Sequence, residues 1–196
     1  MIPWRLRFSG VRDYETIVLD LSGEKDHVLI SGPNGAGKST ITFCMGAVLN
    51  SGKVDIEGLR SNNMPQDQVW RATIDLLFKN AGEVKVDAPE FVQFRLEIEQ
   101  NPGEPIKKEF FIEEGDVMDE WERVTKFTSG GQMNLTEYKN QILYKYAVDP
   151  DAFYLIWYQK EVNQFAIMSA EERFRIFSEM NGIDRKRVDQ VVAGAM

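Results

Sequence analysis

A glycine-rich segment at residues 32–40 constrains the fold more than any other part of the sequence. It reads Gly-Pro-Asn-Gly-Ala-Gly-Lys-Ser-Thr and fits the pattern G-x-x-x-x-G-K-[ST] at every fixed position. A short apolar run at residues 27–31 predicts a buried strand before it, and residues 41–49 predict a buried helix after it. This order of strand, loop and helix is the context in which the pattern binds phosphate, and it predicts an α/β fold.

The residue types in this segment suit the binding of a nucleoside triphosphate. Glycines let the backbone curl so that successive N–H groups point at phosphate oxygens, and the start of the following helix adds positive partial charge. Lys38 is expected to bind the β- and γ-phosphates, and Ser39 to offer its hydroxyl to Mg²⁺. The expected ligands are therefore ATP and Mg²⁺, and the loop residues expected to contact ATP are Pro33, Asn34, Gly35, Ala36, Gly37, Lys38, Ser39 and Thr40.

Composition excludes several other classes of protein. With 196 residues, 43% of them hydrophobic and 28% charged, the chain has room for one globular domain with an extension and is not a disordered protein. No run approaches the ~20 apolar residues of a membrane span, so no membrane partner is expected. The single cysteine, Cys44, cannot form an internal disulfide; we expect it to pack in the core of a cytoplasmic protein.

The charge balance is uneven along the chain. The net charge is −8, and residues 97–122 alone hold ten acidic residues against two lysines. The rest of the chain is therefore neutral, and the protein as a whole does not resemble a basic nucleic-acid binder. The sequence alone does not assign a role to the acidic segment.

Periodicity and turn residues predict the remaining elements. Trp4, Leu6 and Phe8 alternate with polar residues, as in a half-buried strand. Ser169 and Glu172 fit a capping box at the start of a charged amphipathic helix. The expected strands are at residues 4–8, 16–21, 72–78, 91–99, 106–112, 123–127 and 153–158, the three from 72 to 112 being antiparallel; the expected helices are at residues 136–147 and 169–180, and residues 53–68 are expected to be loop.

The sequence after the phosphate loop lacks parts that a hydrolytic enzyme of this kind needs. Such an enzyme holds Mg²⁺ with an acidic residue at the end of an apolar strand, but here the run at residues 153–158 ends at Gln159. The neutral amide of Gln159 suits contact with a Mg²⁺-bound water and with the attacking water. No histidine follows the phosphate loop, so a histidine that senses the γ-phosphate is absent too.

Residues 129–132 allow two interpretations. They read Ser-Gly-Gly-Gln, the core of the signature of transporter-type ATPases, in which an apolar strand closing on Asp-Glu soon follows. Here the next apolar strand closes on Gln159, Lys160 and Glu161. We therefore interpret residues 129–132 as a turn. The alternative is a complete small ABC-type nucleotide-binding domain that uses Ser129–Gln132 as its signature.

Several separate stretches together resemble the N-terminal half of the ATPase head of structural maintenance of chromosomes (SMC) proteins and of their SbcC-type DNA-repair relatives. Residues 10–14, Gly-Val-Arg-Asp-Tyr, resemble the family's G-[FV]-[RK]-[SD]-[FY] turn, and residues 58–64 resemble its arginine loop, L-R-x-x-x-M. Residues 158–165 resemble its Q-loop, with Lys160 where glycine is usual. Residues 171–183 match the E-E-R…[IF]-x-E-x-x-G-I segment where the first coiled-coil arm begins.

The resemblance implies a fold and a domain organisation. Residues 1–182 would form the N-terminal lobe of an α/β, ABC-type P-loop ATPase head, with a mixed β-sheet around the P-loop helix and an antiparallel β-lobe. Residues 183–196 would be the start of the coiled-coil arm or a linker remnant. In this family the C-terminal half supplies the signature, the acidic residues and the switch histidine, which would account for the missing parts.

The resemblance also implies a function and partners. The head would bind ATP, dimerise around it and, with its C-terminal half, hydrolyse it to drive DNA organisation or double-strand-break repair. The expected partners are that C-terminal half, a second head, DNA, and a nuclease or kleisin-type subunit, in a cytoplasmic, nucleoid-associated setting. A nucleotide-binding module without a DNA role is the plainer alternative.

Three residues outside the loop gain roles from the resemblance. Arg12 would bind ATP phosphate, or else lie in a surface turn. Arg60 would act near the γ-phosphate or contact DNA, or else be a solvated loop charge. Lys38, Arg60 and Gln159 would be the catalytic residues, with Ser39 and Gln159 at the metal.

Overall fold

The computed structural model describes residues 1–22, 28–81, 85–131, 133–149 and 165–180, which belong to two units, Met1–Pro150 and Asp151–Met196. The described elements of the first unit are β1 (Ile2–Val11), β2 (Tyr14–Asp20), α1 (Lys38–Val48), the 3₁₀ turn η1 (Glu57–Leu59), β3 (Trp70–Lys79), β4 (Phe91–Gln100), β5 (Lys107–Gly115), β6 (Arg123–Thr128), α2 (Leu135–Asn140) and the π-helical segment η2 (Gln141–Lys145). The second unit contains α4 (Ala170–Met180).

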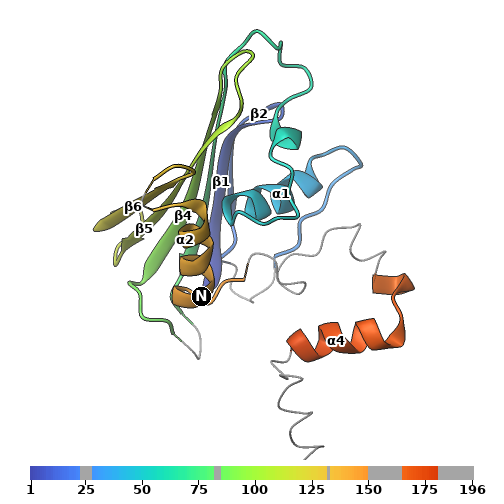
Figure 1. Ribbon diagram of the computed structural model, residues 1–196, viewed down its shortest axis with the longest axis vertical. Helices are drawn as coiled ribbons and strands as arrows, with labels where there is room; N and C mark the ends of the chain where they lie inside the picture. Colours follow the sequence, from blue (N-terminus) through green and yellow to red (C-terminus); the bar gives the residue numbers. More distant parts are fainter. Residues whose placement is uncertain (23–27, 82–84, 132, 150–164, 181–196) are drawn as a thin grey trace, which may run out of the picture. The chain divides into compact units, whose positions relative to one another are not determined.

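The first unit is built on one sheet of six strands in the order β2-β1-β3-β4-β5-β6, and every neighbouring pair is antiparallel (Figure 1). The strands predicted over residues 72–78, 91–99 and 106–112 are confirmed as parts of β3, β4 and β5. The α/β class is confirmed as well. The described strands form this single antiparallel sheet, in place of a mixed sheet with a separate antiparallel lobe.

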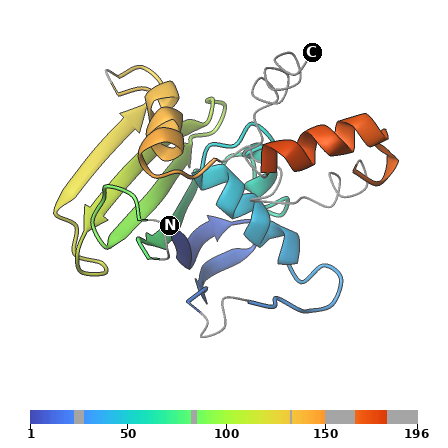
Figure 2. The same ribbon diagram turned by 90° about the horizontal axis from the view of Figure 1, so that it is seen from below.

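One face of the sheet is apolar because strand residues of alternating polarity pair in register. One row across the strands joins Leu6, Leu76, Phe94 and Ile112, and the next joins Phe8, Ile74, Leu96, Phe110 and Phe127. All of these side chains are at most 2% exposed. Helices α1 and α2 lie over this apolar face, which makes it the core of the unit (Figures 1 and 2).

Tyr138 of α2 ties the two helices to each other and to the sheet. Its side chain is fully buried, and its ring contacts the rings of Phe94, Phe110 and Phe127. Its hydroxyl donates a hydrogen bond to the carbonyl oxygen of Val48, 2.6 Å away, at the end of α1. Burial raises the pKa of the Tyr138 hydroxyl, which keeps it a neutral donor. The far end of the helix that begins at the phosphate loop is thereby held in place.

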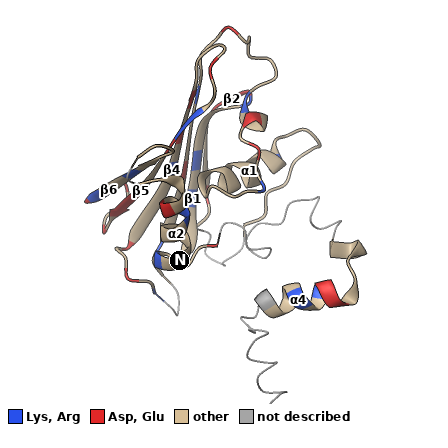
Figure 3. Ribbon diagram, in the orientation of Figure 1, with Lys and Arg blue, Asp and Glu red and all other residues tan. Residues whose placement is uncertain are grey.

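The opposite face of the sheet carries a network of paired charges. Asp75 on β3 is 2% exposed and accepts hydrogen bonds from Arg7 Nε at 2.8 Å and Arg95 Nε at 2.7 Å. Arg95 also pairs with Glu113 at 3.0 Å, and Gln93 donates to the same carboxylate at 2.6 Å. Arg7, Asp75 and Arg95 are register partners on β1, β3 and β4. Figure 3 shows basic and acidic segments together on the strands of this sheet.

These pairs explain the acidic segment at residues 97–122. Several of its carboxylates pair with a basic residue from another part of the unit, so part of the segment belongs to the charge network of the sheet. Buried Glu114 pairs with Lys145 at 2.7 Å and with Arg123 at 3.3 Å. Further pairs are Arg5 with Asp119, Arg71 with Glu99, and Lys126 with Glu109.

The buried strand predicted at residues 27–31 is wrong for its described part, residues 28–31. Val28, Leu29 and Ile30 are 46%, 91% and 40% exposed and belong to no strand. The reason is that a strand needs a neighbour to pair with, and no described strand pairs with this segment. The strand predicted at residues 153–158 lies outside the described residues, as does the expected coiled-coil start at 183–196.

The remaining predicted elements agree with the structure. The helix predicted at 136–147 is α2 followed by η2, and the one predicted at 169–180 is α4. The capping box is present: Ser169 Oγ accepts from Glu172 N–H at 3.3 Å, and Ser169 N–H donates to Glu172 Oε2 at 2.9 Å. Among the described helices, none combines the length and apolar character needed to cross a bilayer.

Glu113 provides a test of the charge network. Burial raises its pKa above the ordinary value of 4.5, and this effect outweighs the attraction of Arg95. The folded chain therefore binds more protons than the unfolded chain between the two pKa values, and stability falls as pH rises through that window. In Glu113→Gln the new amide can donate to Gln93 Oε1, which has no hydrogen-bond partner among the described residues. We expect the free energy of unfolding at pH 7 to equal or exceed that of the wild type, by a margin that shrinks on acidification.

Asp75→Asn is the matched control, because its carboxylate accepts from two arginines. We expect it to lose roughly 1–3 kcal/mol, since the buried carboxylate at this position accepts from two arginines and the amide that replaces it carries no charge to pair with them. Urea unfolding at several pH values measures both variants. An equal loss in the two would contradict the assigned effect of burial at Glu113.

Candidate nucleotide-binding site

The glycine-rich segment forms a loop that runs directly into α1, as predicted. Gly35 and Gly37 have φ of 82° and 83°, in the left-handed region that favours glycine. Gly37 is the N-cap of α1, and no side chain caps the helix there. Thr40 N–H donates to Gly37 O at 2.9 Å, no side chain caps the N–H groups before it, and the helix dipole favours an anion at this end. The backbone has the form that a phosphate cradle requires.

Lys38 closes over the loop at the first position of α1. Its Nζ donates to the carbonyl oxygens of Gly32 and Pro33, both 2.7 Å away. The ammonium therefore lies at the loop itself, where it is placed to meet phosphate oxygens. Proline at residue 33 cannot donate from its nitrogen, so its contribution here is the carbonyl that accepts from Lys38.

The hydroxyl residues after Lys38 differ in burial. Ser39 is exposed, which suits the expected contact of its hydroxyl with Mg²⁺. Thr40 is fully buried, and its Oγ1 has no hydrogen-bond partner among the described residues. Ser39 thus fits the hydroxyl position of a magnesium site, and Thr40 faces the protein interior. Cys44, one turn further on, is fully buried, and burial raises the pKa of its thiol to about 12, so the predicted packing role is confirmed.

Arg12 lies in the two-residue turn that joins β1 and β2. Its φ of 50° is unusual for a residue with a side chain, and its N–H donates to Leu59 O at 2.6 Å. Its guanidinium carbon is 5.9 Å from the centre of the Phe43 ring on α1. The structure thus brings Arg12, exposed, to the side of the phosphate-loop helix, and its role at an ATP phosphate stays a prediction.

Arg60 is engaged in holding its own loop. Its guanidinium donates to Gln100 Oε1 at 2.9 Å, to Pro65 O at 3.0 Å and to Gln68 O at 3.4 Å. Its backbone forms a parallel bridge with Arg12. The side chain therefore fastens residues 61–68 to the end of β4, and a role at the γ-phosphate stays a prediction.

Sequence reasoning missed two side chains that link these motifs. Asp13 accepts hydrogen bonds from the Ser61 hydroxyl and from Asn63 Nδ2, the latter at 3.3 Å, so it joins the β1–β2 turn to the arginine loop. Tyr14 donates from its hydroxyl to the carbonyl oxygen of Ala36 at 3.1 Å, inside the phosphate loop. Both residues lie in the matched motif at residues 10–14, which was the available signal.

Residues 129–131 lie in a turn, as predicted. The turn follows β6 and is closed by a hydrogen bond from Thr128 N–H to Met133 O at 3.0 Å. The next helix, α2, begins only at Leu135 and is capped by Asn134, whose side chain accepts from Glu137 N–H. Gln132, Gln159 and Glu161 lie outside the described residues, so the predicted roles of Gln159 are untested.

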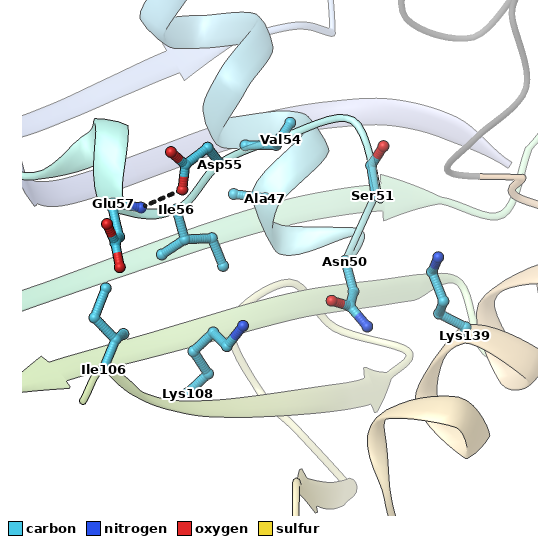
Figure 4. Close-up of a pocket in the computed structure, with 11 residues that line it drawn as sticks. Ala47, Asn50, Ser51, Val54, Asp55, Ile56, Glu57, Ile106, Lys108 and Lys139 are labelled. Atoms are coloured by element: carbon cyan, nitrogen blue, oxygen red, sulfur yellow. Dashed lines mark hydrogen bonds between the residues drawn. The ribbon is translucent and has the colours of Figure 1, made fainter.

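A cavity of about 490 Å³ lies away from the phosphate loop (Figure 4). It is at the opposite end of α1, whose eleven residues span roughly 16 Å. Lys108 of β5 and Lys139 of α2 lie across it from the loop that follows α1, where Glu57 N–H donates to Asp55 at 3.0 Å. Its mixed charges and its distance separate it from the nucleotide site. Among the described residues, no group of three or more His, Cys, Asp or Glu side chains is placed to hold a metal ion.

Comparison with known proteins agrees with this geometry. A family model described as an AAA domain matches residues 5–191. A solved structure from work on ATP-driven dimerisation and DNA-stimulated activation of SMC ATPases matches with a TM-score of 0.60 and 18% identity, covering 92% of this chain and 99% of that one. The SmcHead bound to the C-winged helix domain of ScpA matches with a TM-score of 0.56 and 18% identity, covering 95% of this chain and 53% of that one. No curated protein sequence matches. The chain belongs to the AAA domain family, and its fold is that of the N-terminal half of an SMC-type ATPase head.

Proposed function

We propose that the chain is the ATP-binding half of an SMC-like head that hydrolyses ATP only together with a C-terminal half. The observation that carries the proposal is the phosphate loop, which combines two left-handed glycines, the uncapped start of α1 and Lys38 Nζ beside the loop carbonyls. The proposed ATP contacts are residues 33–40 and Arg12. The experiments below test binding, turnover and dimerisation separately.

The exposed apolar segment before the loop has no partner strand among the described residues. Val28, Leu29 and Ile30 have the composition of a buried strand, yet they are exposed and outside the described sheet. Apolar side chains in such a run are normally covered, because burial of each stabilises the fold by roughly 1.5–3 kcal/mol. A further strand, either the one predicted at residues 153–158 or one contributed by the C-terminal half, would cover them and extend the fold beside the phosphate loop.

The chemistry divides between the two halves. Lys38 would stabilise the phosphate charge, and Ser39 with Gln159 would hold Mg²⁺, whose charge neutralises the phosphate oxygens during transfer. Gln159 would also orient the attacking water. Phosphoryl transfer further requires an acidic residue near that water. The C-terminal half would supply it.

The wider assignment follows from the structural relatives. One of them comes from work on ATP-driven dimerisation and DNA stimulation, and the other is a head bound to ScpA. By analogy we propose a second head, DNA and a kleisin-type or nuclease subunit as partners, in a nucleoid-associated, cytoplasmic role in DNA organisation or repair. The alternative of a complete small nucleotide-binding domain is disfavoured by the turn at residues 129–131 and the late start of α2.

Binding of ATP should depend on Lys38. We expect the chain to bind ATP with Mg²⁺ and Lys38→Ala to abolish binding, because the ammonium is the main charge at the loop. Isothermal titration calorimetry measures both, and Lys53→Ala, after the end of α1, is a control expected to bind as the wild type does. Equal binding by Lys38→Ala and the wild type would refute the proposed site.

Turnover should require the missing half. We expect phosphate release by the chain alone to stay at background and to rise by orders of magnitude when the C-terminal half is added, because that half brings the acid. Gln159→Ala should then lower the restored rate. Robust, Lys38-dependent turnover by residues 1–196 alone would contradict the split head and make Glu161→Gln the next variant to measure.

Dimerisation should follow the same division. The proposed sandwich pairs each phosphate loop with a signature on the other head, so the chain alone should remain monomeric with ATP. Adding the C-terminal half and ATP should double the mass measured by light scattering. An ATP-driven dimer of the chain alone would favour Ser129–Gln132 as a working signature.

A further inference from the structure

Tyr14 is the only residue outside the phosphate loop and α1 for which the described structure gives a side-chain hydrogen bond to that loop. It is the first residue of β2 and pairs with Val11 of β1. Its hydroxyl donates to the carbonyl oxygen of Ala36 at 3.1 Å. Tyr14 is the last residue of the sequence motif at residues 10–14, and the proposed ATP contacts do not include it.

The ring of Tyr14 is anchored in the core of the sheet. It meets the ring of Phe8 edge to face, with 6.0 Å between the centres and 84° between the planes. Phe8 is 2% exposed and belongs to the apolar row that crosses five strands. The hydroxyl is therefore held at a position set by the sheet, and the two-residue turn between β1 and β2 limits its movement further.

Gly37 has no side chain at the point where Tyr14 meets the loop. A Cβ added to Gly37 would lie 1.7 Å from the Tyr14 hydroxyl oxygen and 2.7 Å from the ring carbon that bears it. The φ of 83° favours glycine here, and a side chain would also displace the Tyr14 hydroxyl. The second glycine of the motif thus accommodates the tyrosine as well as the turn of the backbone.

The hydrogen bond also sets the direction of a backbone donor. The peptide between Ala36 and Gly37 is planar and trans, so its C=O and N–H point in opposite directions. With the Ala36 carbonyl held toward Tyr14, the Gly37 N–H points to the other side of the loop backbone. We propose that Tyr14 is a positioning residue that orients the Gly37 amide for a phosphate oxygen of the nucleotide. This inference rests on the proposed binding of ATP at the loop.

Tyr14→Phe tests the proposal because it keeps the ring and removes the hydroxyl. We expect ATP and ADP each to bind the variant about five- to tenfold more weakly than the wild type, because one hydrogen bond that orients a phosphate-binding donor is lost. The factor should be the same for the two nucleotides, since the phosphate concerned is present in both. Tyr144→Phe is the matched control: Tyr144 is 80% exposed in η2, and its loss should leave both affinities unchanged. Calorimetric titration of the full chain gives the affinities, and thermal unfolding should show similar midpoints for all three proteins.

Nuclear magnetic resonance of the full chain without nucleotide gives the second readout. The Gly37 amide resonance should shift in Tyr14→Phe and stay in place in Tyr144→Phe. In the wild type, the ring protons of Tyr14 should show a nuclear Overhauser effect to the Gly37 α-protons. This measurement decides the proposal even where a variant fails to fold.

The two proposals fail in different ways. If the wild type does not bind ATP, the proposed function is wrong, and the resonance of Gly37 still decides whether Tyr14 orients the peptide. If the wild type binds ATP and Tyr14→Phe binds it equally well, the positioning role is wrong. Absence of the Overhauser effect in the wild type would overturn it independently.

Discussion

The antiparallel pairing of β1 with β3 is the constraint on which the nucleotide-binding end depends. At Gly10 the two strands approach so closely that a Cβ would lie 2.0 Å from Arg71 O. Trp70 of β3 donates from its indole to Gly10 O at 2.8 Å and fastens the same point. Arg12, Asp13 and Tyr14 follow directly after this point. The strand pair therefore fixes where these residues lie against α1, the arginine loop and the phosphate loop.

Much of this arrangement could be predicted from the sequence because local patterns determine it. Alternation gave the strands, the fixed spacing of glycine, lysine and serine gave the loop and the helix that starts at Lys38, and Ser169 with Glu172 gave the start of α4. Each of these signals depends on residues within one or two turns of each other. The fold class followed because the patterns agreed with one another.

Other features depend on contacts between distant residues, which a single sequence does not reveal. The order of the strands and the pairing of Asp75 with two arginines follow from register, and they showed the acidic segment to be one side of an internal charge network. The hydrogen bonds of Arg60 to its own loop and of Tyr14 to Ala36 are of the same kind. Residues 28–30 were predicted to form a buried strand and are exposed instead. An apolar run predicts a strand without indicating which strand will pair with it.

The exposed segment of Val28, Leu29 and Ile30 has a consequence for biosynthesis. If its pairing strand lies in a C-terminal half that is made after a coiled-coil arm, the segment waits for that strand while the ribosome adds roughly 5–20 residues per second. During that time the sheet can fold while three aliphatic side chains next to the phosphate loop face water. Such a segment attracts other nascent chains through its unpaired backbone. For a head divided in this way, the exposed segment would need protection until its pairing strand is made. A chaperone at the ribosome could cover it, or the arm could fold back quickly and bring the pairing strand to it.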